Sequence, residues 1–213
     1  MQITLSPKLQ ADLELSSAVA GKRQVVESII DIPTADAEWT RATNVRGNTG
    51  AMLHLRDRSG AESSAGFLPE DFGDETRFES RLRGLKDALL KVGTWRRAVD
   101  RLLTALRPWC ESLPGSPAVR REPVRVVEAQ SGDYESALLT LTRAGRTVLV
   151  CPIAAWVLGF DGQVNIVGAN YRGALYYKRT GNEWVHVPDG LPYRELPLTE
   201  SLFHDVVEAC FDD

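Results

Sequence analysis

"ESLPGSPAVRREPVRV", residues 111–126, separates two halves of the chain with different sequence patterns. It holds three prolines and one glycine, and clusters of these residues interrupt regular secondary structure. Apolar residues recur at helical spacing before it and fall in short runs after it. The predicted organisation is a helix-rich α+β part (residues 1–113), a proline- and glycine-containing linker (114–123) and a part with an antiparallel sheet and one helix (124–213).

Upstream of this segment lie two amphipathic stretches. Apolar side chains recur every three or four positions over residues 78–89 and again over residues 95–106, which is the helical period. Gly93 is typical of the position after a helix, and Thr94 is typical of a helix N-cap. Two helices joined by so short a link are expected to lie antiparallel. The pattern predicts a helix hairpin over residues 74–107.

Other elements of this half have weaker signals. Asp74 is a typical N-cap for the first helix, and Pro108 is expected to end the second. A further helix is expected within residues 7–30. Residues 50–68 alternate apolar and polar side chains on either side of the turn "RDRSG" (56–60), which predicts a hairpin of strands.

Downstream, the chain shows short apolar runs bounded by turn signals such as Ala144-Gly145 and Asp161-Gly162. Thr199 is a typical N-cap for a closing helix. This half therefore predicts an antiparallel meander closed by one helix, and the whole chain an α+β fold. The expected strands are "VRVVEA" (124–129), "ESALLTLTR" (135–143), "TVLVCPIAAWVLGF" (147–160), "QVNIVGA" (163–169), "GALYYKR" (173–179) and "EWVHV" (183–187).

Composition narrows the class of protein. The 213 residues are 43% hydrophobic and 25% charged, with a net charge of −4, which is ordinary for a globular protein. No apolar run reaches the roughly 20 residues of a membrane span, and the first residues lack the basic and apolar regions of a secretory signal. The three cysteines lie far apart, which favours reduced thiols. We expect a soluble cytoplasmic protein without membrane contact.

Cys151 is the candidate nucleophile. A reactive cysteine needs a depressed pKa from a nearby histidine, cation or helix N-terminus, and His186 or His204 could supply the imidazole. Cys151 instead lies in an apolar run beside Pro152, and free cysteine is commonly a small buried hydrophobe. The favoured interpretation is a packing role, with an edge, bulge or bend at Pro152.

No motif predicts a metal or cofactor. The histidines and cysteines never occur at metal-ligand spacing. The tripeptide Asp71-Phe72-Gly73 lacks every other kinase signature, and the acidic residues around it are better explained by helix initiation at Asp74. We expect no bound cofactor and no metal ion.

Aromatic and basic residues cluster in the C-terminal half. Tyrosine, tryptophan and arginine dominate protein–protein contacts, so this cluster predicts a partner-binding surface made of Tyr171, Arg172, Tyr176, Tyr177, Lys178, Trp184 and Tyr193. The alternative is that part of it fills the gap between sheet and helix. A second surface, for a partner or for self-association, is predicted on the helix hairpin at Arg77, Arg81, Arg96, Arg97 and Arg101.

These patterns favour a non-enzymatic module that binds a protein partner, such as an accessory or immunity-type factor of bacterial defence. The acidic final helix would lie beside its binding surface. One alternative is a cysteine-dependent hydrolase that uses Cys151 with His186 or His204. A second is a nucleic-acid-binding accessory protein, which the acidic C-terminal end disfavours.

Overall fold

The computed structural model describes residues 1–32, 36–58, 60–128, 132–188 and 194–212. Its contacts divide the chain into two compact units. The N-terminal unit is Met1–Gly93 with Ala129–Tyr134, and the C-terminal unit is Thr94–Glu128 with Glu135–Asp213. Each unit is built on its own sheet.

The N-terminal unit holds a four-stranded sheet in the order β1-β2-β3-β4. β1 runs parallel to β2, and the other neighbours are antiparallel. The predicted strand hairpin is confirmed as β3 and β4, whereas β1 and β2 were not predicted. The strands are β1 (Gln2–Leu5), β2 (Asp36–Thr43), β3 (Thr49–Arg56) and β4 (Glu62–Phe67).

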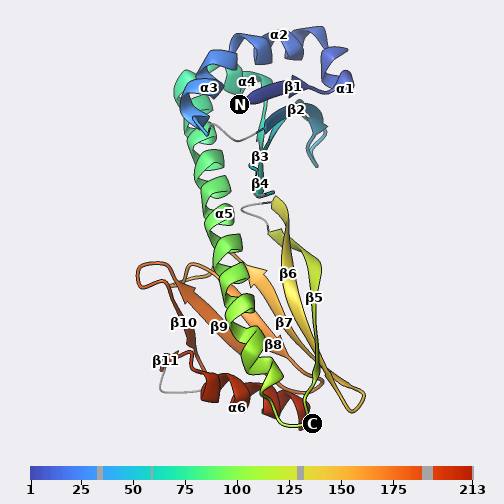
Figure 1. The fold of residues 1–213 in the computed structure, drawn as a ribbon. Coiled ribbons are helices and arrows are strands. Elements are labelled where there is room, and N and C mark those ends of the chain that lie inside the picture. The colour runs from blue at the N-terminus through green and yellow to red at the C-terminus, as the bar shows by residue number, and fades with distance from the viewer. Residues whose placement is uncertain (33–35, 59, 129–131, 189–193, 213) are drawn as a thin grey trace. The chain divides into compact units, whose positions relative to one another are not determined.

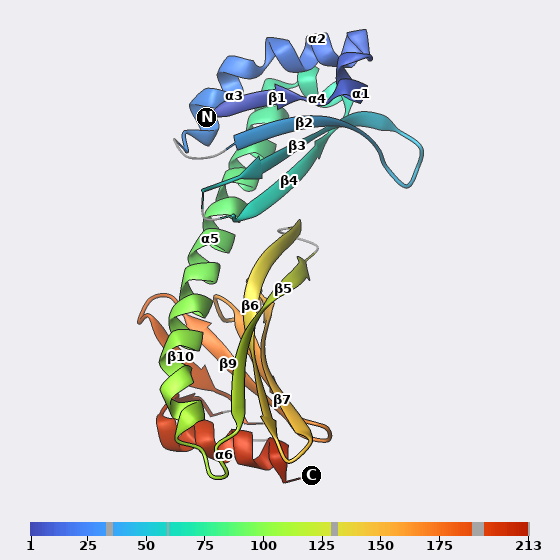
Figure 2. The ribbon, with the colours of Figure 1, turned by 45° about the vertical axis from the view of Figure 1, so that its right-hand side comes forward.

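Helices pack on one face of this sheet (Figure 2). The predicted helical region within residues 7–30 is confirmed, but as three short helices instead of one. Alternate residues of β2 are buried, and Trp39 packs against Phe67 with ring centroids 5.2 Å apart. The short helices of this unit are α1 (Pro7–Gln10), α2 (Leu13–Gly21), α3 (Arg23–Ile30) and α4 (Pro69–Gly73).

The predicted helix hairpin is wrong, because these residues form one continuous helix, α5 (Glu75–Glu111). Gly93 is buried inside it. Glycine costs only about 1 kcal/mol in a helix interior, and burial of the apolar stripe on both sides of it outweighs that cost. The stripe keeps its phase across the glycine through Leu85, Leu89, Val92, Trp95, Val99 and Leu102, all at most 4% exposed.

The two ends of α5 differ in how well they match the prediction. Asp74 is confirmed as the N-cap, since its Oδ1 accepts a hydrogen bond of 3.0 Å from the Arg77 amide. Pro108 does not end the helix, which continues to Glu111. The predicted linker (114–123) covers the turn after α5 and the first half of the next strand.

The C-terminal unit contains the predicted antiparallel meander. Its seven strands follow chain order across the sheet, from β5 at one edge to β11 at the other (Figure 1). Ala144 and Gly145 both have positive φ, at 50° and 79°, as a two-residue hairpin turn requires. The strands are β5 (Ala118–Glu128), β6 (Gly132–Arg143), β7 (Arg146–Ala154), β8 (Gln163–Val167), β9 (Arg172–Lys178), β10 (Glu183–His186) and β11 (Leu196–Pro197).

One face of this sheet, here called the packed face, is covered by α5 and by α6 (Glu200–Phe211). A Cβ added to Gly162 would lie 2.2 Å from the Trp95 ring of α5. A Cβ on Gly168 would lie 2.3 Å from the Cys210 carbonyl oxygen of α6. Both helices therefore approach the sheet at glycines. Thr199 is confirmed as the N-cap of α6, accepting from the Leu202 amide at 3.2 Å.

Among the described helices, none combines the length and the apolar composition that crossing a bilayer requires.

Candidate functional site

The opposite side of the C-terminal sheet, here called the open face, has no helix of the described residues over it. Adjacent strand residues point to opposite faces, so the pairing register assigns each side chain. Val150 pairs with Ile166 on the packed face, and Cys151 pairs with Asn165 on the open face. A cleft of about 510 Å³ lies at the open-face side of β8, β9 and β10, a volume within the range of ligand pockets.

A buried amide forms the floor of this cleft. Asn165 is only 1% exposed, and its neighbours fix the orientation of its amide. With the amide oxygen turned to Arg172, it accepts hydrogen bonds from Nε at 3.0 Å and from Nη2 at 2.6 Å. The Asn165 nitrogen then lies 2.7 Å from Gln163 Nε2, so the Gln163 amide turns as well and presents its oxygen as the acceptor. The guanidinium is thereby held in one orientation.

Arg172 keeps donors for a ligand. Its side chain is exposed, and two of its five N–H groups are used by Asn165. None of the ion pairs among the described residues involves it. Lys178, on the same strand and face, is instead paired with Glu195. Arg172 is therefore the cation of the predicted surface that has no carboxylate partner within the described residues.

Aromatic rings line the same cleft, and His186, at a packed-face position of the pairing register, reaches it at the end of β10. Tyr176 stacks on Phe160 with ring centroids 4.5 Å apart, which fixes the ring at the cleft wall. Tyr171 is 37% exposed at the other side. His186 is 5% exposed and donates from Nδ1 to the Ala174 carbonyl oxygen at 2.9 Å, so its neutral form carries the proton on Nδ1.

Two residues of the predicted surface lie on the packed face instead. Tyr177 is 3% exposed and packs against Trp95 and Trp184, with ring centroids 6.5 and 5.2 Å away. Trp184, half-buried, completes this cluster at 5.7 Å from Trp95. Strand alternation separates Tyr177 from its neighbour Tyr176, so Tyr177 and Trp184 fill the gap between sheet and α5. Tyr193 lies outside the described residues.

The structure does not assemble the candidate thiol–imidazole pairs. Cys151 shares the open face with Asn165 and Ala174, whereas His186 pairs with Leu175 on the packed face. Three strand spacings of about 4.8 Å also separate the β7 and β10 strands.

His204 lies on α6, over the packed face, 2.8 Å from the Trp109 carbonyl oxygen. Cys151 is half-buried, and burial raises the pKa of its thiol. A nucleophile needs the opposite shift. The bend expected at Pro152 is confirmed, since the strand register shifts between Pro152 and Ala154.

The predicted second surface is divided between the two units. Arg77 and Arg81 both face Asp71, with Nε to carboxylate oxygen distances of 2.7 and 3.5 Å. Asp71 is fully buried and also accepts from the Leu68 amide at 2.7 Å. This carboxylate therefore fastens α4 to α5, and the two arginines serve that contact.

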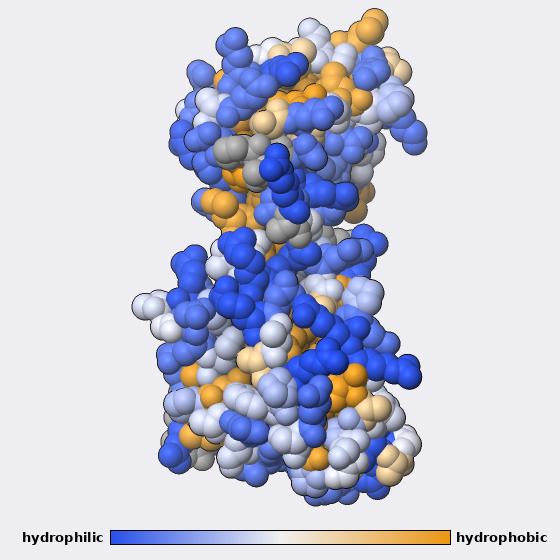
Figure 3. Space-filling view, in the orientation of Figure 1, coloured by the Kyte–Doolittle hydropathy of each residue, from blue (hydrophilic) through white to orange (hydrophobic). Residues whose placement is uncertain are grey.

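The other three arginines lie on the part of α5 that belongs to the C-terminal unit. Arg101 donates to Asn182 at 3.0 Å and Arg97 to Thr94 at 3.2 Å, while Arg96 is half-buried. Beside Arg101, a groove of about 360 Å³ runs along α5 past Trp109 and Trp184. Figure 3 shows apolar patches interspersed with hydrophilic surface on the C-terminal unit.

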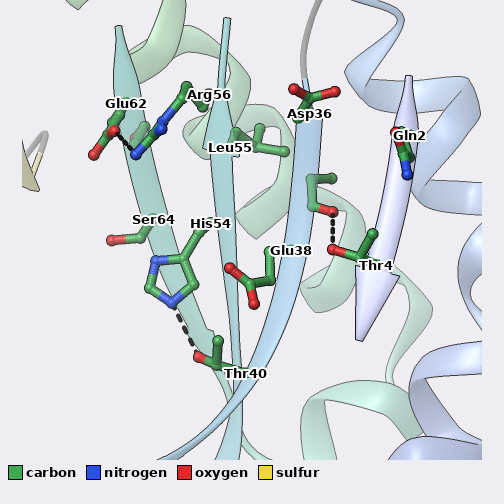
Figure 4. Close-up of a pocket in the computed structure, with 12 residues that line it drawn as sticks. Gln2, Thr4, Asp36, Glu38, Thr40, His54, Leu55, Arg56, Glu62 and Ser64 are labelled. Atoms are coloured by element: carbon green, nitrogen blue, oxygen red, sulfur yellow. Dashed lines mark hydrogen bonds and ion pairs between the residues drawn. The ribbon is translucent and has the colours of Figure 1, made fainter. Parts of the chain in front are cut away.

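A larger hollow, about 750 Å³, lies on the polar face of the N-terminal sheet (Figure 4). Four of its side chains form two cross-strand pairs. Thr40 Oγ1 lies 3.0 Å from His54 Nε2, and Arg56 forms an ion pair with Glu62. The remaining acids are exposed and solvated. Within the described part of the chain, no group of three or more histidines, cysteines or acids is placed to hold a metal ion.

Comparison of the chain with protein-family models, with curated proteins and with solved structures gives no significant match. Sequence reasoning missed Gln163 and Asn165, although "QVNIV" places polar residues at alternate positions of an apolar strand. That alternation indicates a sheet with one open face.

Proposed function

We propose that this protein is a non-enzymatic module that binds a protein partner on the open face of its C-terminal sheet. The observation that carries the proposal is an exposed, oriented arginine in a cleft lined by tyrosine rings. Arginine and tyrosine are the residues most enriched at interface hot spots. Their fixed rotamers reduce the conformational entropy that binding must remove.

Three of the residues first predicted for the surface, Tyr171, Arg172 and Tyr176, line this cleft together. The proposed surface is thus smaller than the predicted one, because Tyr177 and Trp184 belong to the packing against α5. The hydrolase alternative loses its expected geometry, since three strand spacings separate Cys151 from His186 and His204 lies on α6 over the packed face. The immunity-type role and the nucleic-acid alternative stay predictions.

The test is affinity capture with the immobilised full chain and extract of the source cell, quantified by mass spectrometry. We expect at least one protein to bind the wild type and to be lost with the double variant Arg172→Ala/Tyr176→Ala. A matched control, Thr40→Ala/His54→Ala, changes two side chains on the polar face of the N-terminal sheet and should retain that protein. If every captured protein binds all three forms equally, the proposed surface is wrong.

The nucleic-acid alternative is tested on the same protein. It predicts retention of single-stranded DNA or RNA at low salt and a steep loss of affinity as salt rises. No retention at low ionic strength would leave protein binding as the function that this cleft supports.

A further inference from the structure

The open-face cleft combines features that select a particular chemical group. Arg172 forms no ion pair with the residues that the structure describes, and it is anchored by a buried neutral amide instead of a carboxylate. The anchor fixes the direction of the guanidinium without cancelling its charge. A carboxylate anchor, as Glu195 provides for Lys178, would leave little net attraction for an anion.

The donors that remain on Arg172 suit a planar anion. Asn165 takes Nε–H and one N–H of Nη2, so three N–H groups remain, two of them on Nη1. Parallel N–H groups of a guanidinium bind the two oxygens of a carboxylate, and such charge-assisted pairs are about twice as strong as neutral hydrogen bonds. The Arg172 side chain is exposed, so a ligand can reach it without a conformational change.

Apolar and aromatic side chains form one wall of the cleft. Tyr176 is held by its stacking on Phe160, and Ile153, Val187 and Pro188 complete the wall. A ligand with only a carboxylate would leave this wall in contact with water. A ligand with an apolar or aromatic group next to the carboxylate would cover this wall and gain affinity from the apolar surface that it removes from water.

We infer that this cleft binds an acidic peptide segment, with a carboxylate on Arg172 and a neighbouring apolar or aromatic side chain against Tyr176. The inference names the ligand class of the binding surface proposed above and rests on that proposal for its protein partner. Asn165 is a positioning residue that acts through Arg172, and Gln163 supports Asn165 from the other side.

The test uses two matched peptides, acetyl-Phe-Glu-amide and acetyl-Phe-Gln-amide, titrated into the ¹⁵N-labelled full chain. The resonances of Arg172 Nε–H and of the Asn165 side-chain amide report binding by NMR. We expect the Glu peptide to bind about ten- to a hundredfold more tightly than the Gln peptide, because a hydrogen bond to a charged group contributes that much. N-acetylphenylalanine tests whether a chain-terminal carboxylate serves equally well.

Variants assign the effect to the named residues. Arg172→Gln should remove the preference for the Glu peptide. Asn165→Ala keeps the charge of Arg172 but frees its side chain, so it should reduce the preference several-fold without removing it. Arg179→Gln is the control, because Arg179 is an exposed cation that follows the other end of β9 and its charge is already opposed by Asp161. It should leave the preference unchanged, and the spectrum of each variant shows whether it is folded.

Equal binding of the two peptides, or an unchanged preference in Arg172→Gln, would overturn the inference. It would also be overturned if inorganic phosphate at equal ionic strength displaced the Glu peptide at lower concentration than acetate does, because the ligand would then be a phosphate. Peptide binding without any captured protein would instead refute the proposed function and leave the ligand class standing. The two failures are therefore distinguishable.

Discussion

Within the described residues, the two sheets of this protein each have one face covered by helices and one face without them, yet their uncovered faces differ in construction. On the N-terminal sheet, cross-strand neighbours satisfy each other, as Arg56 does with Glu62 and Thr40 with His54. On the C-terminal sheet, a buried amide holds an exposed arginine that has no acidic neighbour among the described residues. The paired side chains of the N-terminal sheet need no further partner in water, whereas Arg172 of the C-terminal sheet keeps hydrogen-bond donors that a ligand can use.

The volume of a cleft does not by itself identify the functional site of this protein. The N-terminal hollow is the larger, at about 750 Å³ against about 510 Å³. Its side chains mostly belong to the solvated face of an ordinary half-buried sheet. A polar residue as buried as Asn165 needs a partner, and the partner here is a cation that points outward. The buried anchor, and not the volume, distinguishes the candidate site.

Thiol accessibility gives the largest expected contrast between the two faces of the C-terminal sheet. Cys151 is half-buried on the open face, whereas Cys110 and Cys210 are buried among the helices. Burial raises the pKa of Cys110 to about 12, with Glu111 adding to the shift. We expect iodoacetamide at pH 8 to label Cys151 at least ~1,000-fold faster than the other two, which react only from the small unfolded fraction. Peptide mass spectrometry after timed quenching measures this ratio.

The absolute rate at which Cys151 is labelled tests the hydrolase alternative. Its raised pKa means that less thiolate is present at every pH below that pKa, so labelling should be slower than for free cysteine and should rise with pH. A Cys151→Ala variant should show no fast labelling. Reaction of Cys151 faster than free cysteine at pH 7 would revive the hydrolase alternative.

Two glycine-to-alanine substitutions, one at the packed face of the C-terminal sheet and one on the polar face of the N-terminal sheet, should change the free energy of unfolding by different amounts. A Cβ on Gly168 would lie 2.3 Å from the Cys210 carbonyl oxygen, while a Cβ on Gly66 of β4 meets nothing within 4 Å. Gly168→Ala must displace the α6 backbone and should lower the free energy of unfolding by about 3 kcal/mol. Gly66→Ala should change it by less than about 1 kcal/mol, with a gain from the restricted unfolded chain. Urea denaturation followed by circular dichroism measures both, and equal losses would refute the close approach of α6.

The ion pair between Arg143 of β6 and Glu208 of α6 gives a further test of the packed face. Arg143 donates to both oxygens of Glu208 at 2.7 and 2.9 Å, and to the Pro114 carbonyl oxygen at 2.7 Å. The hydrogen bonds that Arg143 donates to Glu208 raise the pKa of Arg143, and its guanidinium lies 4.1 Å from the Phe211 ring centroid. Arg143→Gln should lower the free energy of unfolding by about 2 kcal/mol, as for a bidentate, partly buried pair. A loss below about 0.5 kcal/mol in urea denaturation would show that this pair does not hold α6 to the sheet.

The sequence predicts local patterns better than the contacts that make the site. The meander was predictable because each strand is bounded by its own turn signal, such as Ala144-Gly145. The prediction of a helix hairpin was wrong because Gly93 was interpreted as the end of a helix, although the apolar stripe keeps its helical phase across this glycine. β2 was missed despite the alternation of Ala37 and Trp39 with Asp36 and Glu38.

The candidate site shows the same limit. Tyr171, Arg172 and Tyr176 were predictable from composition, because their residue types favour interfaces. Their separation from Tyr177 follows from strand alternation, but which of the two tyrosines faces the helices depends on register. The contact between Asn165 and Arg172 joins two strands, and nothing in either strand alone specifies it. Tertiary pairing, not local propensity, makes the cleft.

The smallest effect is expected on the polar face of the N-terminal sheet. Arg56 and Glu62 lie directly opposite each other on β3 and β4, and their side chains are 66% and 39% exposed. Water and salt screen such a pair, so Arg56→Gln should lower the free energy of unfolding by less than about 1 kcal/mol, and by less still in 0.5 M NaCl. Urea denaturation at two salt concentrations measures this, with Arg143→Gln measured in parallel. If Arg56→Gln cost as much as Arg143→Gln, the polar face would be a structural element, and the contrast drawn between the two uncovered faces would fail.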